Sequence, residues 1–356
     1  MSSPRADFTA TLLQNGHVLL AGGQDSPTSS TAAADIFDPV TMSITPAAPM
    51  KIARSGHTAT LLLDGRVLVV GGHSTPDGTG LASGEIYDPT ANSWSLALPK
   101  CVTCGVLHPH VHHAAVLLAD GGVMVSGGSA GFEMPVAYYP DRHDWIQVGV
   151  RVLPFISWPR PYGSTATRFS NGVAAIHGGG NGLPDPRANT EVELYVSATD
   201  QLTYGDTRLQ DGRNWATATL LGNGTMIVAG GQLTTSPAGA LSTTDLYDPA
   251  PSYCYAPTCG AWSTGPSMNV GHCHHTATLL KKGLLLVAGG RCGTGDSIAV
   301  SELYDPVGKK WWPAGPLQDA RGYHAAALLN DGRVIVAGGF SPGGTISNNV
   351  EIYTPA

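Results

Sequence analysis

Short apolar runs recur along the whole chain at a spacing of about fifty residues. A typical pair reads HTATLL and then VLVVGG, and both runs are rich in β-branched residues. Most pairs are joined by an Asn-Gly or Asp-Gly step, which is a strong short-range signal for a β-hairpin. No stretch shows a sustained period of 3.6 residues. The pattern therefore predicts strands throughout and only incidental helices.

The same unit occurs seven times. Each copy continues with a variable loop and a third apolar run such as EIYDP, and paired glycines end the second run in every copy. Four antiparallel strands per unit, stacked radially, would bury both faces of each sheet. The sequence thus predicts an all-β, seven-bladed β-propeller. The copies begin at Phe8, His57, His113, Ser164, Ala216, His275 and His324.

The chain is expected to form a single propeller that resembles the kelch repeat over its whole length. The last copy ends directly after its third run, so either blade 7 has three strands or the chain is part of a longer protein. Tryptophans after the third run (Trp94, Trp145, Trp262 and Trp311) are expected to cover the outer faces of their blades. The predicted blades are residues 1–49, 50–105, 106–157, 158–209, 210–267, 268–316 and 317–356.

Composition mainly excludes classes of protein. Hydrophobic residues make up 42% of the 356 positions, which is enough for a large core. Nineteen basic against 26 acidic residues give a net charge of −7, which argues against a nucleic-acid or membrane surface. No apolar run approaches the ~20 residues of a membrane helix. We expect a monomer that binds neither nucleic acid nor membrane.

Candidate chemistry gathers where the first strand of each blade begins. These strands are innermost in a propeller, so the residues before them converge at one end of the axis. The histidines that open four copies are common to the repeat, and we expect them mostly to pack between blades. The position before them is polar and varied, which suits either a solvated rim or a site. It holds Asp7, Gly56, His112, Gly163, Trp215, His274 and Tyr323.

A second column lies two positions earlier and shares its strand parity, so we expect it to face the same side. From the two columns together, Asp7, Trp215, Arg213 and Arg321 are expected to contact a substrate. The second column holds Arg5, Arg54, His110, Pro161, Arg213, His272 and Arg321.

Histidines are concentrated in blades 3 and 6, where HPHVHH and GHCHH hold seven of the thirteen in the chain. Imidazole is a common ligand of first-row metals, and these blades lie roughly opposite each other across the axis. The sequence therefore predicts an axial metal, with a copper ion favoured and zinc or another divalent metal as alternatives. The expected ligands are His110, His112, His113, His272, His274 and Tyr323.

The six cysteines form three local pairs: Cys101 with Cys104, Cys254 with Cys259, and Cys273 with Cys292. Such pairs predict disulfides in an oxidising compartment, the extracellular space or the cell envelope, although a cytoplasmic location is also compatible with the sequence. The alternative for the first pair is a zinc site with His108 and His110.

Blades 6 and 7, with GHCHHTATLL and ARGYHAAALL, resemble the catalytic blades of galactose oxidase and related copper radical oxidases. The resemblance implies that Tyr323 and His113 bind copper. The cysteine that this family cross-links to its tyrosine is not matched, because His274 stands in its place with Cys273 adjacent.

Two further positions depart from the galactose oxidase pattern. Glu133 lies in the loop where the family has a second copper-binding histidine, and Phe340 stands nearest to the tryptophan that covers the family's cross-link. The resemblance therefore implies the architecture and the location of a site, but not the radical cofactor.

Three classes of function follow. The first is a metal-dependent oxidoreductase acting on a small molecule or carbohydrate, with Tyr323, His112 and His274 as catalytic residues. The second is a metal-independent lyase or isomerase, in which a histidine accepts a proton, Tyr323 donates one and an arginine holds a carboxylate, as in eliminations on uronic-acid sugars. The third is a protein- or glycan-recognition scaffold using the loops at 73–83, 180–188 and 232–241, which carry few aromatic anchors.

Overall fold

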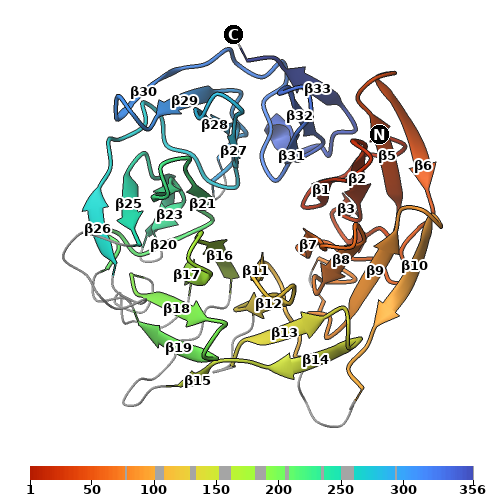
Figure 1. Cartoon of the computed structure of the whole chain (residues 1–356). Coiled ribbons are helices and arrows are strands. Elements are labelled where there is room, and N and C mark those ends of the chain that lie inside the picture. The colour runs from red at the N-terminus through yellow and green to blue at the C-terminus, as the bar shows by residue number, and fades with distance from the viewer. Residues whose placement is uncertain are drawn as a thin grey trace.

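The strands of the chain form sheets that radiate from a central axis, with the chain passing once around the circle (Figure 1). The all-β propeller expected from the sequence is confirmed. Among the residues that the structure describes, six of the blades have four or more strands, and blade 7 has three. The computed structural model describes residues 1–76, 78–100, 108–128, 134–151, 162–180, 190–204, 208–233, 236–249, 260–292 and 295–355.

The strands of blades 1 to 4 follow in chain order from the axis to the rim. They are β1 (Thr9–Leu12), β2 (Val18–Ala21), β5 (Ala34–Asp38) and β6 (Ser43–Ala47) in blade 1; β7 (Thr58–Leu61), β8 (Val67–Val70), β9 (Gly84–Asp88) and β10 (Ser93–Ala97) in blade 2; β11 (Ala114–Leu117), β12 (Val123–Ser126), β13 (Val136–Tyr139) and β14 (Asp144–Gln147) in blade 3; and β16 (Tyr162–Arg168), β17 (Val173–Gly180), β18 (Val192–Val196) and β19 (Gln201–Tyr204) in blade 4, where β15 (Val150–Arg151) adds a parallel edge strand.

Blades 5 to 7 follow the same order. They contain β21 (Thr217–Leu220), β22 (Met226–Ala229), β25 (Thr244–Asp248) and β26 (Ala261–Thr264) in blade 5; β27 (Thr276–Leu279), β28 (Leu285–Ala288), β29 (Ser301–Asp305) and β30 (Lys310–Pro313) in blade 6; and β31 (Ala325–Leu328), β32 (Val334–Ala337) and β33 (Val350–Tyr353) in blade 7. Short elements outside the blades are β3 (Gln24–Ser26), β4 (Ser29–Ser30), β20 (Arg213–Asn214), β23 (Gln232–Leu233), β24 (Ser236–Ala240) and the 3-10 helix η3 (Pro342–Gly344).

The innermost strands close a circle. Each contacts the next in the order β1, β7, β11, β16, β21, β27, β31 and back to β1. The second strand of a blade lies between two neighbouring strands and two neighbouring blades, and it is apolar on both faces. Every residue of β2, β8, β22, β28 and β32 is buried. Apolar side chains between adjacent blades therefore form the core, as where Leu68 of blade 2 joins Val125 of blade 3.

The histidine that opens a blade bonds to the preceding blade. In four blades its Nε2 atom lies within hydrogen-bond distance of a threonine Oγ1 at the start of the previous innermost strand. Blade 1 opens with Phe8 in place of the histidine, and the preceding blade, blade 7, has Ala325 in place of the threonine. The structure thus gives these histidines the packing role that the sequence predicted. The pairs are His57 with Thr9 (3.2 Å), His113 with Thr58 (2.8 Å), His275 with Thr217 (2.9 Å) and His324 with Thr276 (2.9 Å).

The tryptophans of the fourth strands also lie between blades. Trp94 packs on Tyr87 with ring centroids 5.0 Å apart, and its indole N–H donates to the carbonyl of Ala48 in the preceding blade at 2.8 Å. Trp145 and Trp311 bond to their preceding blades in the same way. Three of the four tryptophans therefore pack at the junction with the preceding blade, because a buried indole N–H needs an acceptor and that blade supplies one.

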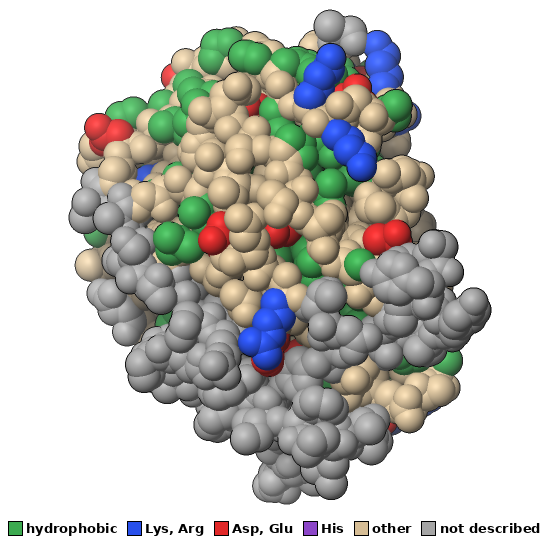
Figure 2. All heavy atoms as spheres, turned by 90° about the vertical axis from the view of Figure 1, so that its left-hand side faces the viewer, with side chains coloured by type: hydrophobic (Ala, Val, Ile, Leu, Met, Phe, Trp, Pro, Cys, Tyr) green, Lys and Arg blue, Asp and Glu red, His purple; other side chains and the backbone are tan. Residues whose placement is uncertain are grey.

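The rim of the propeller is mixed in character. On the face shown in Figure 2, acidic side chains are scattered and apolar ones form small groups between polar atoms. In the described ranges, no helix has the length and apolar character needed to cross a membrane.

Candidate functional site

Seven residues surround the axis at the end where the innermost strands begin. We call them the mouth ring, and all seven have positive φ, from 46° at His274 to 73° at Gly163. This left-handed conformation suits glycine but costs of order 1–3 kcal/mol for other residues. Five strained non-glycine residues therefore gather at one place. The mouth ring is Asp7, Gly56, His112, Gly163, Trp215, His274 and Tyr323.

Backbone hydrogen bonds run around the mouth ring and hold its conformation. The N–H of one ring residue donates to the carbonyl of the ring residue in the preceding blade. These bonds join separate blades, so they help to maintain the strained φ values. The bonds run from Gly56 to Asp7 (3.0 Å), His112 to Gly56 (2.8 Å), Gly163 to His112 (2.9 Å), Trp215 to Gly163 (3.2 Å), Tyr323 to His274 (3.0 Å) and Asp7 to Tyr323 (2.8 Å).

One pair of side chains in the ring joins a carboxylate to an imidazole. Nε2 of His112 lies 2.8 Å from Oδ2 of Asp7. Burial alone would raise the pKa of the Asp7 carboxyl, but the adjacent His112 outweighs it and the pKa lies below its usual range. A Cβ at Gly56 would lie only 2.7 Å from the His112 ring. Glycine at position 56 therefore leaves room for the pair to form.

The second pair joins an imidazole to a phenol. The Tyr323 hydroxyl lies 2.8 Å from Nε2 of His274, and the rings stack with centroids 3.7 Å apart. Burial, helped by the nearby His112, lowers the pKa of His274 to about 3, so this imidazole is neutral at neutral pH. Burial and the charge of Asp7 raise the pKa of Tyr323 above its usual range. The phenol therefore keeps its proton and can donate it to Nε2 of His274.

Trp215 lies between the two pairs. Its ring centroid is 4.2 Å from that of His274 and 4.8 Å from that of His112. The mouth thus holds two hydrogen-bonded pairs beside an aromatic ring. Among the described residues, no group of three or more His, Cys, Asp or Glu side chains is placed to hold a metal ion. The structure brings together Asp7, His112, Trp215, His274 and Tyr323 from the residues that the sequence singled out.

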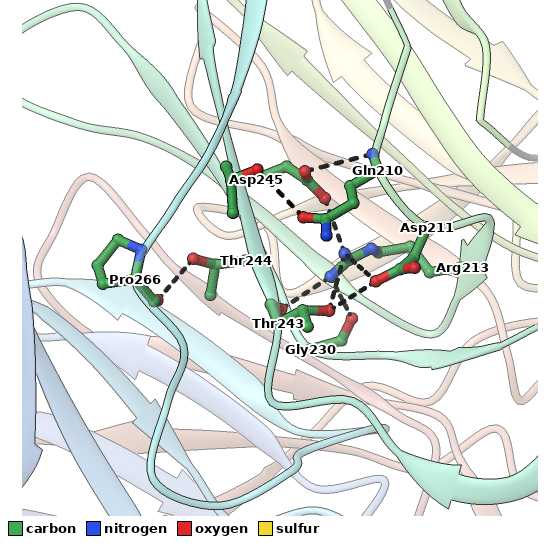
Figure 3. A network of polar contacts seen from close by, with 9 residues as sticks. Gln210, Asp211, Arg213, Gly230, Thr243, Thr244, Asp245 and Pro266 are labelled. Carbon is green, nitrogen blue, oxygen red and sulfur yellow. Dashed lines mark hydrogen bonds and ion pairs between the residues drawn. The ribbon is translucent and has the colours of Figure 1, made fainter.

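The arginines of the second column lie elsewhere. Arg213 is completely buried and Arg321 is 1% exposed. Figure 3 shows the Arg213 guanidinium among Asp245, Asp211 and backbone carbonyls; its Nη2 lies 2.7 Å from Asp245 Oδ2. Arg321 pairs with Glu351 at 2.7 Å in the same way. The expected substrate contacts of Arg213 and Arg321 are therefore corrected to blade packing, because neither side chain is accessible.

The histidines of the second column are also buried between blades. Nδ1 of His110 lies 2.7 Å from the carbonyl oxygen of Gly127, and Nδ1 of His272 lies 2.7 Å from that of Gly289. Both are buried, as is His113, so the structure does not bring these three expected metal ligands to the mouth ring. Parity counting failed because the residues of the first column, which form the mouth ring, themselves have positive φ, and this breaks the alternation of extended backbone.

Three further residues lie close to the mouth ring, and of these the sequence analysis missed Arg291. Each of the three directly follows the Gly-Gly pair of its blade. His73 meets the His112 ring edge-on with centroids 5.5 Å apart, and Phe340 meets Tyr323 at 5.6 Å. Arg291 holds the same position in blade 6, where its N–H donates to the carbonyl of Cys273. Reading the position after Gly-Gly in every copy of the unit would have found Arg291 as well.

A disulfide braces the mouth at blade 6. It joins Cys273 and Cys292, whose Cα atoms are 5.6 Å apart, and so links the residue before His274 to the residue after Arg291. The predicted pairing of these two cysteines is confirmed. The other expected pairs, Cys101 with Cys104 and Cys254 with Cys259, lie outside the described residues, as does Glu133.

Reducing this disulfide is expected to destabilise the fold by about 3 kcal/mol, because the cross-link closes a loop of 19 residues in the unfolded chain. Urea unfolding with and without reductant measures the loss. The Cys273→Ser/Cys292→Ser double variant is the control, since it should start from the lower stability and show only the response to reductant that comes from the remaining cysteines. Equal midpoints for the oxidised and reduced wild type would contradict the prediction.

Comparison with known proteins places this geometry in context. Residues 53–97 match the Kelch motif family model. No curated protein matches the sequence. Among solved structures, a fungal alcohol oxidase of the AA5 family, in complex with copper, matches with a TM-score of 0.72 at 16% identity over 95% of this chain and 71% of that chain. The chain therefore has a kelch motif and shares the fold of a copper oxidase. Since 612 chains match in fold, function has to be argued from the site.

Proposed function

We propose that the chain is an enzyme that transfers protons on a polar small molecule, of the carbohydrate class, bound at the mouth ring. The observation that carries the proposal is the presence of two hydrogen-bonded pairs, Asp7 with His112 and His274 with Tyr323, each at 2.8 Å. One pair contains a carboxylate beside an imidazole and the other a protonated phenol. When the surroundings of neighbouring titratable groups push their pKa values apart, one group can act as an acid and another as a base in the same site.

In this proposal His112 is the base. Asp7 engages its Nε2 atom, which leaves Nδ1 to accept a proton from a carbon or hydroxyl of the substrate. The Asp7 carboxylate stabilises the imidazolium that forms, so the charge created by proton transfer remains close to its counter-ion. Asp7 also keeps the ring in one orientation. The aspartate is therefore a positioning residue for His112.

Tyr323 is the acid. Its hydroxyl carries a proton because burial and Asp7 raise its pKa. In the tautomer of His274 that carries its hydrogen on Nε2, the imidazole donates to the phenol oxygen and leaves the O–H free for the substrate. Donation of this proton to a leaving oxygen would complete an elimination: the C–H bond breaks at His112, the C–O bond breaks at Tyr323, and a C=C bond forms between the two carbons. A proton leaves one atom and another is returned, so an isomerisation uses the same groups. Neither reaction needs a co-reactant.

A metal-dependent oxidoreductase is the second candidate, and the fold shared with a copper-bound alcohol oxidase favours it. The donors of the mouth do not fit a single copper centre of that kind. They form two separate pairs with the Trp215 ring between them, and the described residues contain no group of three His, Cys, Asp or Glu ligands. Tyr323 stacks on a histidine where the related oxidases have a cross-linked cysteine. We therefore place metal chemistry second.

Turnover in the presence of a chelator separates the two candidates. Protein purified without a histidine tag is dialysed against EDTA, analysed for copper and zinc, and assayed on a panel of uronic-acid and neutral oligosaccharides. The proposal predicts unchanged turnover of at least one carbohydrate in metal-free protein. Loss of turnover that copper restores would replace it with the oxidoreductase. Since disulfides form in oxidising compartments, we further propose that the protein works as a monomer in the extracellular space or cell envelope.

A further inference from the structure

We propose that Arg291 recognises the substrate, and that the substrate therefore carries a carboxylate on a carbon that bears a hydrogen and an oxygen substituent, as uronic-acid sugars and hydroxy acids do. This inference rests on the function proposed above and names the class of molecule on which the mouth ring would act.

The backbone fixes Arg291 beside the ring. Its N–H donates to the carbonyl of Cys273 at 2.8 Å, and the Cys273–Cys292 disulfide ties the following residue to the same strand opening. Cys273 directly precedes His274 in the ring. Arg291 is thus held at the edge of the His274–Tyr323 pair by the hydrogen bond of its own N–H and by the disulfide of the next residue.

The guanidinium of Arg291 is held by an aromatic face and forms no ion pair with the residues that the structure describes. Its central carbon lies 5.3 Å from the centroid of Phe340, whose ring in turn meets Tyr323. Within the described part of the chain, its side chain donates one hydrogen bond, from Nε to the carbonyl of Gly295 at 3.3 Å. Neither terminal nitrogen is paired with a carboxylate of the described residues.

This situation contrasts with the buried arginines of the same propeller. Arg5, Arg54, Arg213 and Arg321 each form an ion pair with an aspartate or glutamate of their own blade. Arg291 has the same forked donor group, which matches the geometry of a carboxylate, but remains partly exposed at the mouth. The donors that the other arginines use for packing are therefore available here to a ligand.

The charges of the mouth would also orient such a ligand. Asp7 places a carboxylate at one end of the site, where it is engaged with His112, and Arg291 places a cation beside Phe340 and Tyr323 at another. A substrate carboxylate is repelled by the first and attracted by the second. The carbon next to the carboxylate would then lie between Arg291 and the base, His112. Its hydrogen would be more acidic there, because the guanidinium neutralises the charge of the adjacent carboxylate.

Binding of matched sugars tests the inference. Isothermal titration with galacturonate, methyl galacturonate ester and galactose compares one ring with and without the charge, and D-glycerate represents hydroxy acids. We expect galacturonate to bind the wild type at least 10-fold more tightly than its methyl ester and galactose, or D-glycerate to bind at least 10-fold more tightly than these neutral sugars. Arg291→Gln should weaken that binding by roughly 10- to 100-fold, as expected for lost hydrogen bonds to a charged group. Arg291→Lys should recover part of it.

The control variant is Arg168→Gln, which removes an exposed arginine at the far end of β16 and should leave binding unchanged. Circular dichroism and the urea midpoint confirm that each variant folds. Equal affinity for acid and neutral sugar, no binding of either acid, or full affinity in Arg291→Gln would each overturn the inference.

These results are separable from the proposed function. If Tyr323→Phe abolishes turnover of a neutral sugar that Arg291→Gln still converts, the proton-transfer site stands and the carboxylate assignment fails. If Arg291→Gln loses carboxylate binding while Tyr323→Phe turns over the acid normally, Arg291 keeps its role and the acid–base proposal fails.

Discussion

Acidification from pH 7 to pH 5 is expected to remove about 10 kcal/mol of stability, comparable to the 5–15 kcal/mol that folds a typical domain. The cause is a set of five neutral imidazoles. Burial lowers the pKa of His57, His274 and His324 to about 3 and holds those of His113 and His275 well below the ordinary 6.5. Below pH 6.5 these five imidazoles bind protons in the unfolded chain but stay neutral in the folded chain. The stabilisation is therefore complete above pH 6.5 and is lost progressively as the pH falls toward 3.

Urea unfolding followed by tryptophan fluorescence between pH 8 and pH 4.5 measures this loss. The chain itself supplies a matched control, because Phe8 and Ala325 occupy at one blade junction the places that a histidine and a threonine occupy at four others. A Cβ at Gly338 would meet the Phe8 ring at 2.6 Å, just as one at Gly22 would meet His57 at 2.7 Å. A phenylalanine ring can therefore occupy the position of the histidine ring against the glycine of the preceding blade.

The double variant Thr9→Ala/His57→Phe should fold and lose one titrating group. Its free energy of unfolding should fall less steeply with acid, by about 1.4 kcal/mol per pH unit between pH 6 and pH 4. An unfolding midpoint that stays constant from pH 8 to pH 5 in the wild type would show that the histidines are not held neutral.

Tyr323→Phe is expected to lower kcat by roughly 10²- to 10⁴-fold, because it removes the proposed proton donor and leaves the ring stacked on His274. His112→Gln should have an effect of similar size through loss of the base. The fold should survive both changes, since the backbone bonds of the mouth ring do not involve these side chains. Steady-state kinetics on a carbohydrate found in the metal-free screen measures the effect.

Tyr353→Phe provides the comparison for this measurement, because Tyr353 lies on β33 away from the mouth ring and should leave kcat unchanged. If Tyr323→Phe retained more than half of the wild-type kcat, Tyr323 would not be the acid. A loss confined to KM would instead assign the hydroxyl to binding.

Sequence reasoning reached the fold because the fold repeats. Gly-Gly pairs directly follow the second strand in six blades and lie near the end of β17 in the other, and a Cβ at Gly71 would lie 2.3 Å from the His110 carbonyl of the next blade, so no other residue fits there. The packing role of the opening histidines was equally visible, since a residue common to the repeat is more often structural than catalytic. Each of these positions recurs in several copies of the repeat, so the chain itself shows which residue types it accepts there.

The candidate site was found only in part, for a physical reason. His112, Trp215, His274 and Tyr323 adopt left-handed backbone that none of these residue types favours, so no local preference announces the turn. Parity counting across that turn moved Arg213 to the wrong side. Arg291 was missed because its loop varies between repeats, although its offset from the Gly-Gly pair is constant.

The most direct measurement is a crystal structure of Tyr323→Phe soaked with a carbohydrate that the wild type converts, recorded with anomalous data at the copper edge. The account predicts the sugar over the mouth ring, with its reacting carbons between His112 and residue 323 and no anomalous peak. A copper peak shared by His112 and His274, or a sugar bound on the rim of the blades with the ring empty, would contradict it.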